Sequence, residues 1–96
     1  MTRDAVIRRI EEAVGIEEAA EIIMFDGMED AFIGVAERFE PDGNHRAFAV
    51  YSYAGMVAVL TADGDLDRDD AHVYLEFNTV GLYAGPHTPA ILRDES

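Results

Sequence analysis

The chain has 96 residues and neither cysteine nor tryptophan, and its 20 acidic residues against seven arginines and no lysine give a formal charge of −13. This length corresponds to one domain, and 49% hydrophobic residues make the chain too apolar to be disordered, so a single domain over residues 1–96 is expected. The composition excludes disulfides and thiolate metal sites, and the scarcity of cations argues against direct nucleic-acid binding.

The N-terminal segment, residues 2–25, predicts two helices. Apolar residues recur at three- and four-residue steps behind Thr2, an N-cap candidate, so a helix is expected over 3–14. Gly15 interrupts the pattern, and acids followed by apolar residues predict a second helix over 17–24. An Asp-Gly pair then ends the helical segment.

Two strands joined by a turn follow. Aromatic and β-branched residues predict a strand over 31–39, and alternating apolar residues predict another over 46–53. The intervening Pro-Asp-Gly-Asn sequence is typical of a turn, which favours an antiparallel hairpin. The two-residue period of a strand places Phe32 and Val35 on opposite faces.

The C-terminal half predicts two more helices and a last strand. A change of period indicates a helix over 54–62, and Asp67 can cap another over 68–79. A short strand is expected over 89–92 beside the hairpin, followed by a frayed tail at 93–96. The expected fold class is α+β, with a small three-stranded antiparallel sheet packed against helices in the order ααββααβ.

A dense signature lies near the C-terminus. The pattern E-F-N-x-x-G-x-Y-x-G-x-x-T-P is carried by Glu76, Phe77, Asn78, Gly81, Tyr83, Gly85, Thr88 and Pro89. On these residues and on the first strand, the chain over about 26–92 resembles a group of small uncharacterised proteins encoded by tailed phages and prophages. The resemblance implies a viral or prophage origin and a shared fold, and it implies no activity.

The negative charge falls into two acidic blocks. Residues 17–44 hold nine acids and one arginine, a net −8, and residues 63–96 hold eight acids and two arginines, a net −6. Dense carboxylates can imitate nucleic-acid phosphates and bind a basic groove of a host protein. The residues predicted to bind a partner are Glu17, Glu18, Glu21, Asp65, Asp67, Asp69, Tyr83 and His87. The competing interpretation is that the acidity reflects only a high-GC genome or a high-salt cytoplasm.

Patterns for metal binding and catalysis are weak. Asp65, Asp67, Asp69 and Glu76 have the spacing of calcium ligands in an EF-hand, but Asp70 stands where that loop requires glycine. A capped, solvated helix N-terminus explains the same acids. The three histidines lack zinc-ligand spacing, and no nucleophile elbow or phosphate-binding glycine pattern is present. We therefore expect no enzyme, no metal and no cofactor.

The sequence favours a non-enzymatic viral or prophage accessory protein that binds a host or viral protein. No apolar run has the length of a membrane-spanning helix, and N-terminal charges do not fit a signal peptide, which favours the host cytoplasm. The signature residues have a structural interpretation, in which Asn78 bonds to exposed carbonyls near a helix end and Gly81 and Gly85 permit positive φ. The functional alternative is that Phe77, Tyr83, His87 and Thr88 form an exposed rim that contributes to the contact. The alternatives are an assembly protein acting as a homo-oligomer and a small carboxylate-metal or hydrolytic enzyme.

Overall fold

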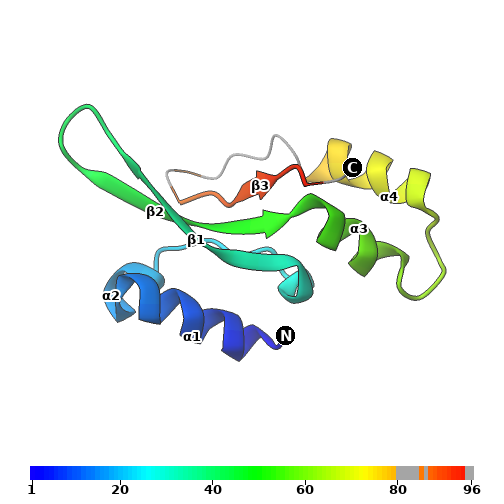
Figure 1. Ribbon diagram of the computed structural model, residues 1–96, viewed down its shortest axis with the longest axis horizontal. Helices are drawn as coiled ribbons and strands as arrows, with labels where there is room; N and C mark the ends of the chain where they lie inside the picture. The colour runs from blue at the N-terminus through cyan, green and yellow to red at the C-terminus, as the bar shows by residue number, and fades with distance from the viewer. Residues whose placement is uncertain (80–84, 86, 95–96) are drawn as a thin grey trace.

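The computed structural model describes residues 1–79, 85 and 87–94, in which helices pack against a three-stranded sheet (Figure 1). The elements are α1 (Arg3–Val14), α2 (Ile16–Ala19), η1 (Glu29–Ala31), β1 (Phe32–Phe39), β2 (His45–Ser52), α3 (Tyr53–Thr61), α4 (Arg68–Asn78) and β3 (Ala90–Leu92). The α+β class and the predicted order of these elements are confirmed. The molecule is elongated, with extents of 43 × 28 × 23 Å.

Three of the four predicted helices agree with the structure to within one residue, because local signals define their ends. The Thr2 hydroxyl accepts a hydrogen bond from the Ala5 amide at 3.1 Å and begins α1. The Asp67 carboxylate accepts one from the Asp70 amide at 2.8 Å and begins α4. No helix in the described part of the chain combines the length and the apolarity needed to cross a bilayer.

The helix predicted over 17–24 is wrong in its extent, because α2 ends at Ala19. Beyond α2 the chain lies against the sheet without regular secondary structure, and the Phe25 amide donates to the Tyr51 hydroxyl at 3.1 Å. Such contacts use backbone donors that a longer helix would have paired internally. Tertiary packing therefore overrides the helical pattern of this segment.

The sheet has the order β1-β2-β3 and is mixed. β1 and β2 form the predicted antiparallel hairpin, in which Glu37 is opposite Ala47. β3 pairs with β2 in parallel, with Ile91 opposite Tyr51, so the prediction of a purely antiparallel sheet is wrong. Parallel neighbours require a long crossover connection, and the stretch that contains α3 and α4 supplies it.

A register irregularity between Phe32 and Gly34 changes the expected faces of β1. Val35 is paired with Ala49 and Phe32 with Tyr51, so both lie on the core side of the hairpin. Simple alternation had placed them on opposite sides. An extra residue in one strand shifts the side-chain alternation, as β-bulges commonly do.

The two faces of the sheet are covered differently. Ala47, Ala49 and Tyr51 of β2 are buried in the core. The alternate residues Phe48 and Val50 are only partly buried, and the core cluster of the described residues does not include them. We call the face that carries Phe48 and Val50 the second face of the sheet.

Tyr51 lies at the centre of the core. Its ring centroid is 5.0 Å from that of Phe25 and 5.8 Å from that of Phe32. Burial raises the pKa of the Tyr51 hydroxyl above its ordinary value of 10.0. The cluster also receives Ile10 from α1 and Leu75 from α4, so it joins helices from both ends of the chain to the sheet.

The beginning of α3 is capped by two side chains. The Ser52 hydroxyl accepts from the Gly55 amide at 2.8 Å, and the Asp94 carboxylate accepts from the Ala54 amide at 2.9 Å. Asp94 also accepts from the Ser52 hydroxyl, and these hydrogen bonds hold the pKa of Asp94 below its ordinary value of 3.8. Asp94 is thus bonded to α3, although a frayed tail was expected over 93–96, of which residues 95–96 lie outside the described residues.

Candidate functional site

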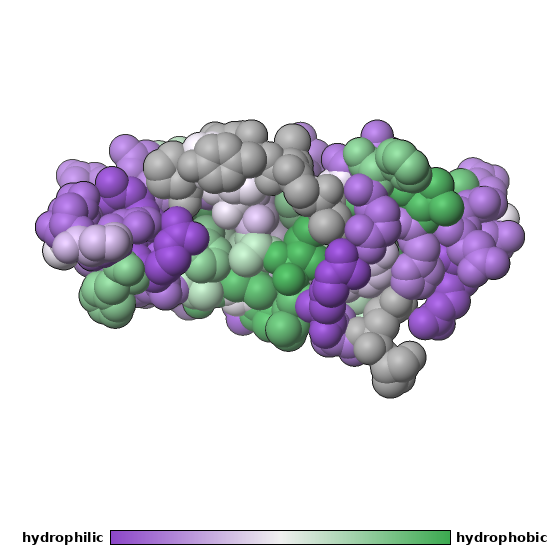
Figure 2. Space-filling model, turned by 90° about the horizontal axis from the view of Figure 1, so that it is seen from above, coloured by the Kyte–Doolittle hydropathy of each residue, from purple (hydrophilic) through white to green (hydrophobic). Residues whose placement is uncertain are grey.

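The acids near α2 and α4 form two groups. We name them the α2 acids, Glu17, Glu18 and Glu21, and the α4 acids, Asp63, Asp65, Asp67, Asp69 and Asp70. The α2 acids border a shallow hollow beside Val14. In Figure 1, α2 lies near one end of the long axis and the loop between α3 and α4 near the other. Hydrophilic residues dominate both ends in the view from above (Figure 2). The fold therefore separates the two groups.

Local structure accounts for several of the α4 acids. Asp67 caps α4, and the Asp63 carboxylate accepts from the Asp65 amide at 3.1 Å. Asp69 and Asp70 lie in the first turn of α4, where the helix dipole favours carboxylates. Within residues 1–79, 85 and 87–94, no group of three His, Asp or Glu side chains is arranged to hold a metal ion. The EF-hand spacing is thus not assembled into a metal site.

His87 has an internal position. Its Nδ1 lies 2.7 Å from the carbonyl oxygen of Ala47, and its Nε2 lies 3.5 Å from the carboxylate of Glu21. His87 therefore connects one of the α2 acids to β2 and does not stand on an exposed rim. Thr88 is also only partly exposed, and Tyr83 lies outside the described residues.

The outer side of α4 carries the most exposed apolar residues of the helix. Phe77 is 84% exposed, Val73 56% and Tyr74 45%, whereas Ala71 and Leu75 on the inner side are completely buried. We call Val73, Tyr74 and Phe77 the outer face of α4. The rim expected from the sequence included Phe77, but Val73 did not enter that prediction. The spacing of Val73 and Phe77 is the signal that was available, since residues four apart share one side of a helix.

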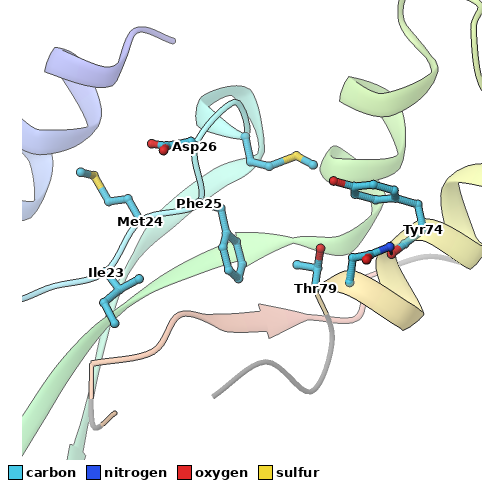
Figure 3. Close-up of a pocket in the computed structure, with 8 residues that line it drawn as sticks. Ile23, Met24, Phe25, Asp26, Tyr74 and Thr79 are labelled. Carbon is cyan, nitrogen blue, oxygen red and sulfur yellow. Dashed lines mark hydrogen bonds between the residues drawn. The ribbon is translucent and has the colours of Figure 1, made fainter. Parts of the chain in front are cut away.

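A hollow of about 240 Å³ adjoins this face (Figure 3). Tyr74 of α4 points toward the segment that precedes η1, and Phe25 of that segment lies across the hollow. The hollow is lined by Ile23, Met24, Phe25, Asp26, Met28, Tyr74, Asn78 and Thr79. Sequence reasoning missed it because its two walls come from segments about fifty residues apart, which only the fold brings together.

Polar contacts support the walls of the hollow. Asp26 pairs with Arg3 of α1, which ties the preceding segment to the first helix. The Asn78 side-chain amide donates to the carbonyl oxygen of Tyr74 at 3.1 Å. The second bond satisfies a carbonyl near the C-terminus of α4.

A network behind α4 holds the helix in place. The Tyr53 hydroxyl donates to the Glu76 carboxylate at 3.2 Å and lies 3.1 Å from His72 Nδ1. Arg93, just after β3, pairs with Glu76 at 3.0 Å and stacks over the Tyr53 ring at 5.1 Å. α3, α4 and the chain after β3 are thus joined on this side, which leaves the outer face of α4 toward solvent.

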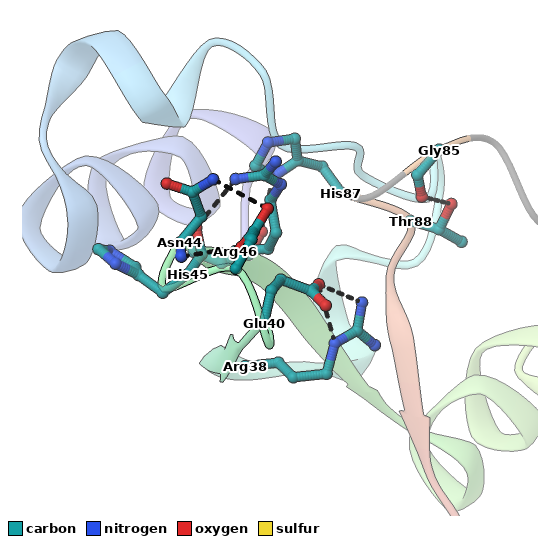
Figure 4. Close-up of polar contacts among 10 residues, drawn as sticks. Arg38, Glu40, Asn44, His45, Arg46, Gly85, His87 and Thr88 are labelled. Carbon is teal, nitrogen blue, oxygen red and sulfur yellow. Dashed lines mark hydrogen bonds and ion pairs between the residues drawn. The ribbon is translucent and has the colours of Figure 1, made fainter.

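The hairpin also carries an exposed aromatic residue, which serves for comparison. Phe39 is 77% exposed, and its ring centroid lies 5.7 Å from that of His45. The neighbouring Arg38 donates twice to the Glu40 carboxylate, at 3.1 and 3.3 Å (Figure 4). The hairpin tip lies at the opposite end of the molecule from α4 (Figure 1).

The size of the hollow limits what it can hold. Sites for small molecules typically enclose roughly 300–1,000 Å³, and about 240 Å³ is below that range. The lining is mainly apolar, which suits one large side chain of a partner protein. Aromatic residues are enriched at the centres of protein interfaces, so an exposed aromatic face beside such a hollow fits an interface.

Comparisons with protein-family models, curated proteins and solved structures find no match. The candidate site therefore rests on the geometry of the chain itself. It comprises the outer face of α4, the adjoining hollow and the α4 acids.

Proposed function

We propose that this protein is a non-enzymatic viral or prophage accessory protein that acts in the host cytoplasm by binding a host or viral protein. The viral origin rests on the sequence signature around Glu76 to Pro89. The observation that carries the binding function is the outer face of α4, where Phe77 is 84% exposed and Tyr74 lines an apolar hollow. Contiguous exposed apolar surface on a small protein usually marks an interaction site.

Capture from host lysate with two matched variants tests this function. Phe77→Ser and Phe39→Ser each remove one exposed phenylalanine, the first from α4 and the second from the end of β1. We expect Phe77→Ser to reduce the amount of captured partner about tenfold or more, because aromatic residues buried at an interface supply much of its binding energy. Phe39→Ser should leave the yield unchanged. Equal yields from the wild type and Phe77→Ser would show that the partner binds elsewhere or that no specific partner exists.

A second candidate is self-assembly through the second face of the sheet. Phe48 and Val50 are only partly buried there, and a second copy could cover them. If the protein assembles in this way, light scattering should give a discrete oligomer, and Phe48→Asp should return the mass to that of one chain. A monomeric wild type at all concentrations would remove this candidate.

A further inference from the structure

We infer that the partner segment is a cationic amphipathic helix, which places one large apolar side chain in the hollow beside Tyr74 and its basic residues against the α4 acids. This inference rests on the proposed function and names the chemistry of the partner. It starts from the arrangement of α4. Asp70, Val73, Tyr74 and Phe77 occupy positions i, i+3, i+4 and i+7 of the helix, so they share one side.

The apolar part of this side fits a helical partner. Helices that dock in grooves place apolar anchors at i, i+3 or i+4, and i+7. Val73, Tyr74 and Phe77 form an apolar strip about one helical turn long, so α4 can contact one such anchor and its nearest neighbours. The hollow takes one large anchor, since its volume is about 240 Å³. Met24 and Met28 in its wall can adjust to the shape of that anchor, because methionine is flexible and polarisable.

The charges next to the strip select a basic partner. Five aspartates lie between Asp63 and Asp70, against one arginine in the same stretch, Arg68. Asp26 at the edge of the hollow is already paired with Arg3, so the negative charge available to a partner comes from the α4 acids. Charged groups around an apolar centre set the choice of partner and the rate of association.

The same charges disfavour a second copy of this chain as the occupant. Two parallel α4 helices would place their α4 acids side by side. Two antiparallel helices would place the α4 acids of one copy against the C-terminal dipole and Glu76 of the other. Each copy also carries a net charge of −13. A lysine- or arginine-rich helix meets none of these repulsions.

Fluorescence anisotropy with three synthetic peptides tests the inference. The first is a labelled amphipathic helix with leucine and tryptophan on one side and lysine on the other. The second replaces every lysine with glutamate, and the third keeps the lysines but scatters the apolar residues around the helix. We expect the first to bind at least about tenfold more tightly than either control, because binding needs both the apolar face and the positive charge.

Matched protein variants locate the contact. Asp69→Asn with Asp70→Asn removes two charges beside the outer face of α4, and Glu17→Gln with Glu18→Gln removes two at the other end of the molecule. Each neutralised α4 acid should lower the affinity for the lysine peptide about twofold to fivefold at low salt, which is the usual effect of losing an exposed charge pair. The Glu17 and Glu18 variant should bind nearly as the wild type does. Phe77→Ser should lose most of the affinity.

The outcomes separate this inference from the proposed function. The inference of a cationic helix would be wrong if the glutamate peptide bound as tightly as the lysine peptide. It would also be wrong if the two charge variants lost the same amount of affinity for the lysine peptide. Strong binding of the scattered peptide would contradict it as well, since that indicates attraction to net charge alone. If no peptide binds while capture from lysate still depends on Phe77, the inference is wrong and the protein-binding function stands. If neither peptide binding nor capture from lysate depends on Phe77, the inference and the proposed binding function are both wrong. Thermal melts of every variant exclude unfolding as the cause.

Discussion

The two sides of α4 carry similar apolar side chains but play different parts. Leu75 and Ala71 on the inner side are completely buried, whereas Phe77 and Val73 on the outer side are mostly exposed. Hydrophobicity alone therefore does not identify the core of this protein. Burial assigns the inner side to stability, and the outer side is the surface that we propose binds a partner.

The largest expected effect contrasts Leu75 with Phe77. Leu75→Ala should lower the free energy of unfolding by about 2–5 kcal/mol, because it leaves a cavity in a fully packed site. Phe77→Ala should change it by less than about 0.5 kcal/mol, as exposed substitutions usually do. Urea denaturation monitored by circular dichroism measures both. Similar losses from the two variants would mean that the outer face of α4 is packed in solution.

Two glycines give the next contrast. A Cβ added at Gly55 would lie 3.1 Å from the backbone and side chain of Ala31, so Gly55→Ala should cost about 1–3 kcal/mol through overpacking. A Cβ at Gly34 of β1 meets nothing within 4 Å. Gly34→Ala should therefore be neutral or stabilise the protein by up to about 1 kcal/mol. Thermal melts compare the two, and a tolerated Gly55→Ala would show that η1 and α3 are not in close contact.

Two tyrosines give a smaller contrast. Tyr51→Phe removes the hydroxyl that pairs with the Phe25 amide and should cost about 0.5–1.5 kcal/mol, whereas Tyr74→Phe on the outer face of α4 should cost almost nothing. The raised pKa of Tyr51 also adds a pH dependence. Its hydroxyl ionises more readily in the unfolded chain, so stability should fall as pH rises past 10.0. Denaturation across that range should show a weaker fall in Tyr51→Phe.

The smallest expected effect concerns an exposed carboxylate. The pKa of Asp94 is lower in the folded chain than its ordinary 3.8, so its stabilisation is present above pH 3.8 and is lost as pH falls through the folded value. The melting temperature of Asp94→Asn should therefore fall less steeply on acidification than that of the wild type. Asp65→Asn, in the loop before α4, is the control and should follow the wild type. An unchanged slope in Asp94→Asn would mean that the contact to Ser52 and Ala54 is not formed.

Local signals predicted most of the fold. Thr2 and Asp67 begin their helices through hydrogen bonds to nearby amides, and such contacts depend on only a few neighbouring residues. The extent of α2 and the direction of β3 were not predictable in this way. Both depend on partners distant in the chain, namely Tyr51 for the segment after α2 and the crossover through α3 and α4 for β3.

The candidate site was predicted in part. The sequence identified the acidic residues and the aromatic character of Phe77, because charge and residue type are visible without a fold. It did not show that the α2 and α4 acids lie at opposite ends, or that Ile23 and Met24 line a hollow with Tyr74. Those relations depend on how the helices are placed around the sheet. The roles of Glu17, Glu18, Glu21, Asp65, Asp67, Asp69, Tyr83 and His87 in binding a partner remain predictions.

The cap that Asp94 places on α3 has a consequence for the order of folding during synthesis. The helix and its cap are separated by forty residues, and the pairing of β2 with β3 spans a similar distance. The residues of α1, the hairpin and α3 are therefore synthesised before residues 90–94, which pair with β2 and cap α3. Long-range parallel pairing also forms slowly. The nascent chain must hold an incomplete sheet edge until residues 90–94 arrive, which makes this edge the point where a chaperone or a neighbouring chain can intervene.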